Sequence, residues 1–132
     1  MTKVICDLNC GNSPRAALLR DFNVAFAKGD LDAMLSILDD NIVWEMMGHK
    51  TFEGKAAVTE MLKGIMGQGE SDEYELLSII THGAEAACKG TVRSSDGSMI
   101  AFADFYRFVS ASKNGIKRIV SYAIDLSEDS AS

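Results

Sequence analysis

No apolar run in this sequence approaches the roughly 18 residues that a membrane-spanning helix needs. The opening residues, Met1 to Asp7, contain an early acidic side chain and no hydrophobic segment of the kind that marks a secretory signal. We therefore expect no membrane association and a cytoplasmic location. The sequence also has no internal repeat, interdomain linker or extended low-complexity region, so its 132 residues predict one domain.

Cysteine is scarce, and its three copies are an odd number. A chain of this size can build its own core, so we expect reduced thiols rather than a disulfide framework. Cys6 and Cys10 have three residues between them, and no second Cys or His pair follows to complete a structural zinc site. No nucleophile motif and no His and carboxylate spacing of a metal site is present, so we expect neither a metal nor an organic cofactor.

Basic residues are outnumbered, with 13 Lys and Arg against 19 Asp and Glu and a net charge of −6. Binding to a phosphate backbone needs clustered Lys and Arg, so nucleic acid is not an expected partner. The hydrophobic content of 47% and the charged content of 24% are ordinary for a globular protein.

Three helices are predicted in the first half of the chain. Ser13 followed by Pro14 is typical of a helix start, and Gly29 ends that helix. Its apolar residues recur at helical spacing, at Leu18, Leu19, Phe22 and Phe26. A shorter helix follows Asp30, has Leu31, Met34, Leu35 and Leu38 on one face, and ends in the acidic turn 39–41. The third helix is predicted over 55–66.

Extended segments make up most of the remainder. Residues 42–47 are rich in β-branched, aromatic and Met side chains and predict a strand. Four further strands are predicted over 73–81, 85–93, 99–111 and 116–125, where turn residues such as Asp96-Gly97 and Asn114-Gly115 favour antiparallel hairpins. The pattern predicts an α+β domain over 14–126, with helices on one sheet face, an N-terminal extension over 1–13 and a frayed tail over 127–132.

Three segments carry a resemblance to a known family: residues 27–34 (AKGDLDAM), 39–45 (DDNIVWE) and 52–58 (FEGKAAV). Together with the element order, they resemble the nuclear transport factor 2-like superfamily and, within it, the SnoaL-like and ketosteroid isomerase-like branch. The resemblance extends from Pro14 to about Asp125. It implies a cone-shaped fold, in which three helices pack on the concave face of a curved, mixed or largely antiparallel sheet.

The same resemblance implies catalytic positions. Laid on the isomerase pattern, Glu45 falls on the catalytic base and Asp104 on the aspartic acid that donates a hydrogen bond to the substrate oxyanion. The position of a third group, a tyrosine on the first helix, is occupied by Phe22, which has no hydroxyl. Tyr106 and Tyr122 are the side chains that could supply a replacement donor, although each is equally suited to the core or to the wall of a ligand site.

The alternation of side chains along the strands does not decide whether Glu45 and Asp104 lie on the enclosed face of the sheet or on the other face. Glu45 shares a face with Val43 and Met47, and enclosure of that face would raise its pKa toward the range of a general base. The alternative is a solvent-facing Glu45 with Trp44 and Met46 buried instead.

Asp104 shares its face with Phe102, Tyr106 and Phe108, which favours burial in a protonated form that donates a hydrogen bond. This role is the one that the resemblance to ketosteroid isomerase implies, because a buried aspartic acid stays neutral in that enzyme. The alternative is an Asp104 that forms a structural ion pair with Arg107 or Arg118.

We expect an apolar pocket for a small hydrophobic molecule, although Met at helical or strand spacing is more often plain core. The side chains expected to line it are Phe22, Met47, Met61, Phe102, Tyr106 and Tyr122. The expected reaction is acid-base proton transfer on a hydrophobic carbonyl compound, as in an isomerase, cyclase or dehydratase, and the alternative is a noncatalytic ligand-binding or dimerisation module. The opposite sheet face is also apolar, with Trp44, Met46, Ala103, Phe105 and Val109 expected there, and so predicts a homodimer through the sheet.

Overall fold

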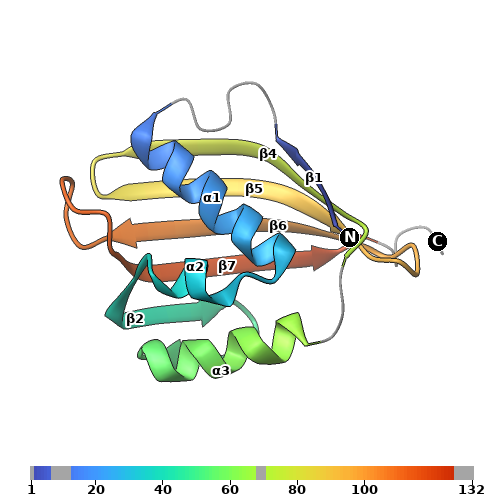
Figure 1. Cartoon of the computed structure of the whole chain (residues 1–132), viewed down its shortest axis with the longest axis horizontal. Coiled ribbons are helices and arrows are strands. Elements are labelled where there is room, and N and C mark those ends of the chain that lie inside the picture. The colour runs from blue at the N-terminus through green and yellow to red at the C-terminus, as the bar shows by residue number, and fades with distance from the viewer. Residues whose placement is uncertain (1, 7–12, 68–70, 127–132) are drawn as a thin grey trace.

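The computed structural model describes residues 2–6, 13–67 and 71–126 of the chain. Within these ranges three helices and seven strands follow one another, as Figure 1 shows. Their bounds in chain order are β1 Lys3–Cys6, α1 Pro14–Lys28, α2 Leu31–Leu35, β2 Leu38–Met46, β3 Thr51–Glu53, α3 Lys55–Met66, β4 Glu73–His82, β5 Glu85–Arg93, β6 Met99–Phe108 and β7 Ile116–Asp125.

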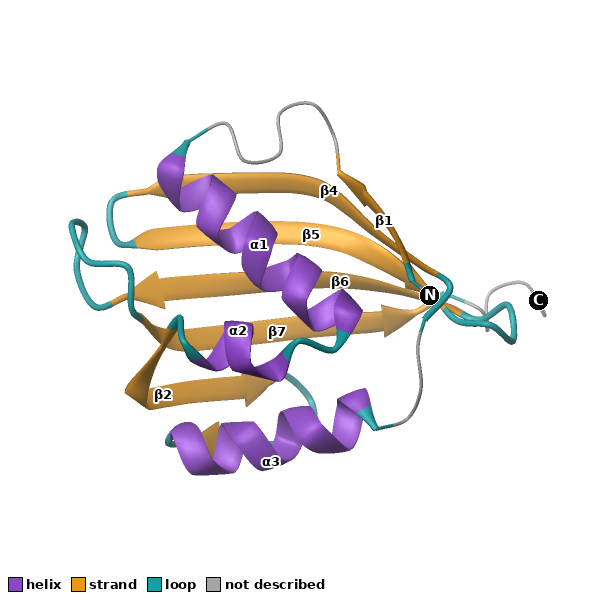
Figure 2. Cartoon of the chain, viewed as in Figure 1, coloured by secondary structure: helices purple, strands orange, loops and turns teal. Residues whose placement is uncertain are grey.

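The strands form one curved sheet in the order β1-β4-β5-β6-β7-β2-β3. β1 pairs with β4 and β2 pairs with β7 in parallel, whereas the other neighbouring strands are antiparallel. The helices lie on one side of this sheet, with α1 crossing β4 to β6 and α3 running beside β2 (Figure 2). The predicted α+β class, with three helices packed against a curved mixed sheet, is confirmed.

The hydrophobic core lies between the helices and the sheet face that they cover, which we call the inner face. Fully buried side chains reach it from each helix: Leu19 of α1, Met34 of α2, and Val58 and Leu62 of α3. The sheet contributes Ile42, Trp44, Tyr106, Phe108, Ile116 and Ile119. Burial of each large apolar side chain stabilises the fold by about 1.5–3 kcal/mol, so this layer holds the helices on the sheet.

The ends of α1 agree with the predicted signals. Ser13 Oγ accepts a hydrogen bond from the backbone N–H of Ala16 at 3.2 Å, and Pro14 occupies the first turn. Gly29 ends the helix in the left-handed conformation with φ 74°, which glycine adopts without a steric penalty. The bounds of α3, β5 and β7 also match the predictions.

Three differences between the predicted and the observed elements concern strand pairing. The extension over 1–13 contains β1, which pairs with β4 about 70 residues away, between Lys3 and Glu73. The three-residue strand β3 pairs with β2, and β2 itself begins at Leu38, so the predicted acidic turn 39–41 belongs to a strand. The sequences of very short strands and of an acidic strand do not predict strand structure, because these segments are stabilised mainly by pairing with other strands.

Cys6 takes part in a disulfide bond, so the expectation of reduced thiols is wrong for this residue. Cys10 and the predicted frayed tail over 127–132 lie outside the described residues. Among the residues that the structure describes, no group of three or more His, Cys, Asp or Glu side chains could hold a metal ion. Within the same ranges, no helix is long and apolar enough to span a membrane.

Candidate functional site

Two side-chain contacts establish which side chains of the sheet face the helices. The indole Nε1 of Trp44 on β2 donates a hydrogen bond to Ser121 Oγ on β7 at 2.8 Å. Asp104 on β6 pairs in register with Ser121, and their side chains are hydrogen-bonded. Trp44, Ser121, Asp104 and the buried Tyr106 therefore share the inner face.

Asp104 lies at the centre of a polar cluster within this apolar layer. Its Oδ2 atom accepts a hydrogen bond from the hydroxyl of Tyr106 at 3.3 Å, and Cys88 Sγ lies 4.0 Å away. Desolvation raises the pKa of Asp104 to about 6, although the hydrogen bonds from Ser121 and Tyr106 lower it. The residue as a whole is half-buried, at the boundary of the apolar layer.

A second layer of polar groups surrounds Tyr106. Asn23 of α1 donates from Nδ2 to the Tyr106 hydroxyl at 3.2 Å and to the carbonyl of Leu19 at 2.9 Å. The hydroxyl of Tyr74 on β4 donates to Asn23 Oδ1 at 2.7 Å. Six elements thus contribute to one hydrogen-bonded cluster, which links Trp44, Ser121, Asp104, Cys88, Tyr106, Asn23 and Tyr74.

The titratable neighbours of Asp104 are neutral at ordinary pH. Burial raises the pKa of the Cys88 thiol to about 12, and it raises the pKa of Tyr74 and that of Tyr106 well above their usual value. The negative charge of Asp104 raises all three pKa values further. Asp104 is therefore the member of the cluster whose protonation changes near neutrality.

Glu45 lies on the other face of the sheet, which we call the outer face. Its neighbour Trp44 is buried on the inner face, and Glu45 Oε1 instead accepts a hydrogen bond from Arg118 at 2.9 Å. This ion pair is accessible to solvent, with 30% of the Glu45 side chain and 46% of the Arg118 side chain exposed. The structure does not bring Glu45 and Asp104 together, which corrects the predicted catalytic pair. The alternative placement, with Trp44 buried and Met46 partly buried against the core, is the one observed.

The side chains predicted to line a pocket divide between the two faces. Phe22 and Tyr106 are buried in contact at 6.2 Å between ring centroids, and Met61 and Phe102 pack partly buried against the same core. Met47 is exposed beyond the end of β2, and Tyr122 is exposed on the outer face against Phe105. Only the first four can therefore lie near Asp104.

Two surface clefts lie away from the Asp104 cluster. One is at the start of α1, between Arg15 and Asn114, and the other is on the outer face between Ile80 and Phe105. Neither is lined by Asp104. A hydrophobic pocket at the cluster remains a prediction.

Several members of the cluster were not predicted from the sequence. Asn23 follows Leu19 by four residues, so its amide lies on the apolar face of α1. A polar side chain at such a position is a signal for a buried hydrogen bond. Ser121 and Trp44 were detectable only once β2 and β7 were known to pair, because they lie 77 residues apart. Tyr74 likewise depends on the packing of α1 across β4.

The sequence of the chain matches the family model of the SnoaL-like domain over residues 19–120. No curated protein matches the chain. Among solved structures, an NTF2-like protein of unknown function from Burkholderia xenovorans LB400 is 18% identical with a TM-score of 0.72, covering 84% of this chain and 83% of that chain.

Two further solved structures are similar to this chain. A proposed ketosteroid isomerase from Kribbella flavida DSM 17836 is 14% identical with a TM-score of 0.68, covering 82% of this chain and 76% of that chain. A proposed SnoaL-like polyketide cyclase from Shewanella denitrificans OS-217 is 11% identical with a TM-score of 0.70, covering 84% of this chain and 90% of that chain. At these identities the likeness shows a shared fold. The family match, which covers most of the described domain, shows that this chain belongs to the SnoaL-like domain family.

Proposed function

We propose that this SnoaL-like domain is a small-molecule enzyme that transfers a proton on a hydrophobic carbonyl compound, with Asp104 as the group that carries the proton. The observation behind the proposal is one carboxyl group, half-buried among apolar side chains, whose pKa burial raises to about 6. A carboxyl with that pKa exchanges protons readily at neutral pH, as general acid-base catalysis requires.

The proposed step is removal of a proton from the carbon next to the carbonyl group. The C–H bond breaks, an O–H bond forms on Asp104, and the electron pair moves onto the carbonyl oxygen to give an enolate. When the substrate is a β,γ-unsaturated carbonyl compound the product is a dienolate, and return of the proton from Asp104 to its γ carbon completes an isomerisation and restores the carboxylate. Cyclisation and dehydration share the first step, so Asp104 suits all three reactions.

The apolar neighbours of Asp104 support a hydrophobic substrate. Phe102 stacks on Tyr74 with ring centroids 5.2 Å apart, and the partly buried Met46, Met61 and Met66 pack at the edge of the same core. Methionine side chains adapt to irregular apolar shapes, so these residues suit a planar or polycyclic molecule better than a strongly charged one.

Deuterium exchange tests the proposed step without knowledge of the natural substrate. We expect the protein to accelerate exchange of the protons next to the carbonyl of 2-tetralone in D2O, measured by proton NMR against buffer alone. Asp104→Asn should reduce exchange to the buffer rate, because an amide cannot accept the proton. Exchange that persists in the folded Asp104→Asn variant would assign the chemistry to another group.

A noncatalytic ligand-binding module is the second candidate. It is favoured by the position of Glu45 on the outer face and by Phe22, a buried side chain without a hydroxyl, at the place of the helix tyrosine. This function predicts that 2-tetralone perturbs the NMR signals of Phe102 and Tyr106 while its exchange rate stays at the buffer value.

We also propose that the outer face pairs with a second copy of the chain. Ile80, Phe105, Tyr122 and Ile124 are exposed on this face of β4, β6 and β7, with Ile80 66% and Ile124 64% accessible. The Glu45–Arg118 and Glu85–Arg107 ion pairs place both signs of charge on this face. A face that carries both signs around an apolar centre can match itself across a two-fold axis, as a homodimer requires.

A further inference from the structure

We propose that Asn23 and Trp44 are positioning residues that aim the hydroxyl protons of Tyr106 and Ser121 at Asp104, so that Asp104 begins the reaction as the proton acceptor. This inference rests on the proposed function and adds to it the direction of the first proton transfer. It differs from the expectation that Asp104 is a protonated donor to an oxyanion. The geometry behind it is the direction of the hydrogen bonds that lead from Asn23 and Trp44 to Asp104.

The orientation of the Asn23 amide is determined by its other partners. Its Nδ2 atom lies 2.9 Å from the carbonyl oxygen of Leu19, which can only accept, while Oδ1 receives the hydroxyl of Tyr74 at 2.7 Å. The group that faces Tyr106 at 3.2 Å is therefore also Nδ2, which donates. Since the Tyr106 oxygen accepts this bond, its own proton points to a different acceptor.

Two acceptors are within reach of that proton. Asp104 Oδ2 and Cys88 Sγ each lie 3.3 Å from the Tyr106 oxygen. A carboxylate oxygen is a much stronger acceptor than a thiol sulfur, so the proton of Tyr106 lies toward Asp104. Asn23 is buried, with 3% of its surface exposed, so solvent does not compete for its amide in this arrangement.

Trp44 acts in the same way on the other side of Asp104. The indole N–H can only donate, and it donates to Ser121 Oγ at 2.8 Å. Ser121 is thereby an acceptor for Trp44, and its own proton is available for the hydrogen bond to Asp104. Asp104 thus accepts from two hydroxyls, each held by an N–H donor behind it.

This arrangement favours the carboxylate over the protonated acid. Two O–H donors stabilise a negative charge, whereas a protonated carboxyl would have to direct its own proton away from both. The other titratable groups facing Asp104 are Cys88 on β5, Tyr74 on β4 and Tyr106 on β6, and all three are neutral at pH 7. The hydroxyls are therefore the groups that offset the cost of burying the charge.

The test is a carbon-13 NMR titration of Asp104 in protein labelled at the aspartate carboxyl carbons, with the Asp104 signal assigned by its loss in Asp104→Asn. We expect Ser121→Ala and Tyr106→Phe each to raise the pKa of Asp104 by about 1. Trp44→Phe and Asn23→Leu should raise it by a smaller amount. Ile119→Val, which removes only a methyl group from the side chain paired with Trp44, is the control and should leave the pKa unchanged.

A double-mutant cycle separates positioning from packing. If Trp44 acts through Ser121, Trp44→Phe should raise the pKa of Asp104 in the wild-type background and have no further effect in Ser121→Ala. Asn23→Leu should likewise have no further effect in Tyr106→Phe. Unchanged pKa values in folded Ser121→Ala and Trp44→Phe proteins would overturn the proposal.

The pH dependence of 2-tetralone exchange supplies the link to function. In each variant the acidic limb of the rate profile should shift to higher pH by the same amount as the NMR pKa of Asp104, since the carboxylate is the reactive form. If the wild-type protein fails to accelerate exchange, the proposed function is contradicted while the NMR titration still decides the positioning roles. If exchange occurs but the variants leave the pKa of Asp104 unchanged, only the positioning roles are contradicted.

Discussion

The indole Nε1 of Trp44 lies 2.8 Å from Ser121 Oγ, and this contact joins β2 to β7 on the inner face of the sheet. Trp44 stands next to Glu45 in β2, and neighbouring strand residues point to opposite faces. The burial of Trp44 therefore directs Glu45 toward Arg118 on the outer face. It leaves Asp104 as the carboxyl group of the inner cluster.

The stability of the Asp104→Asn variant relative to wild type should increase as the pH rises. The folded pKa of about 6 exceeds the ordinary value of 3.8, so the stabilising contribution of Asp104 is fully present below pH 3.8 and is lost as the pH rises through 6. The stability of the variant relative to wild type should therefore increase between pH 4 and pH 8 by up to about 3 kcal/mol. Urea unfolding at both pH values measures this difference, and an equal difference at both would contradict the raised pKa.

Glu45→Gln should change neither catalysis nor stability strongly. The substitution removes an ion pair that is partly exposed on both sides, which is worth about 0–1 kcal/mol. We expect 2-tetralone exchange to stay within about twofold of wild type, because the side chain does not reach the inner face. A loss of exchange in the folded variant would return a catalytic role to Glu45.

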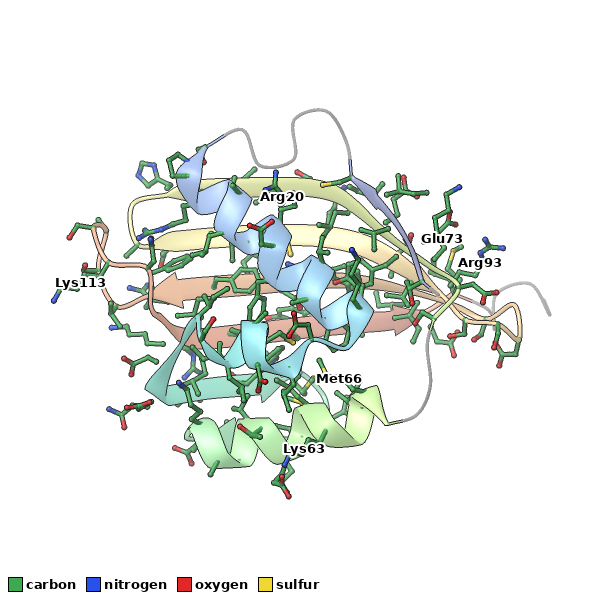
Figure 3. All side chains as sticks on the ribbon, viewed as in Figure 1. Arg20, Lys63, Met66, Glu73, Arg93 and Lys113 are labelled. Carbon is green, nitrogen blue, oxygen red and sulfur yellow. The ribbon has the colours of Figure 1, made fainter. Side chains whose placement is uncertain are left out.

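Phe105→Asp should shift the protein toward a monomer. Phe105 is 52% exposed and packs edge-on against Tyr122 on the outer face, so a charge there would have to be desolvated in a sheet-to-sheet dimer. Sedimentation velocity at micromolar concentration measures the change. Lys63→Glu is the control, because Lys63 points away from the sheet on α3 (Figure 3). A wild-type protein that sediments as a monomer would contradict the proposed dimer.

Gly90→Ala should destabilise the fold next to the site. A Cβ atom at Gly90 would lie 2.2 Å from the carbonyl oxygen of Glu75 and 2.8 Å from Cζ of Phe102, so β4 or the Phe102 ring would have to move. Overpacking of this kind costs about 1–3 kcal/mol.

Gly64→Ala provides a control of the opposite sign. A Cβ atom at Gly64, within α3, would meet nothing within 4 Å. The substitution should stabilise the helix by about 0.5–1 kcal/mol. Thermal unfolding of both variants compares the two effects, and equal stability of Gly90→Ala and wild type would contradict the close approach of Phe102.

The sequence by itself determined the features that depend on neighbouring residues. Ser13, Pro14 and Gly29 specify the ends of α1 through local hydrogen bonds and backbone preferences, and the hairpin strands follow from side-chain alternation and turn residues. The three segments that resemble the SnoaL-like branch, together with the order of the elements, predicted the whole α+β fold. The family resemblance pointed to Asp104 as a site residue, and the three aromatic residues on its strand face predicted its burial.

The tertiary structure decided which face of each strand meets the helices. Alternation defines two faces but not which is buried, so β2 could bury Trp44 or Glu45 until its parallel pairing with β7 set Trp44 against Ser121. β1 depends in the same way on a distant partner, β4. The hydrogen bonds to Asp104 depend on both the helices and the sheet, since Asn23 comes from α1 and Ser121 from β7. Only the packing of α1 on the sheet brings these groups to one carboxyl group.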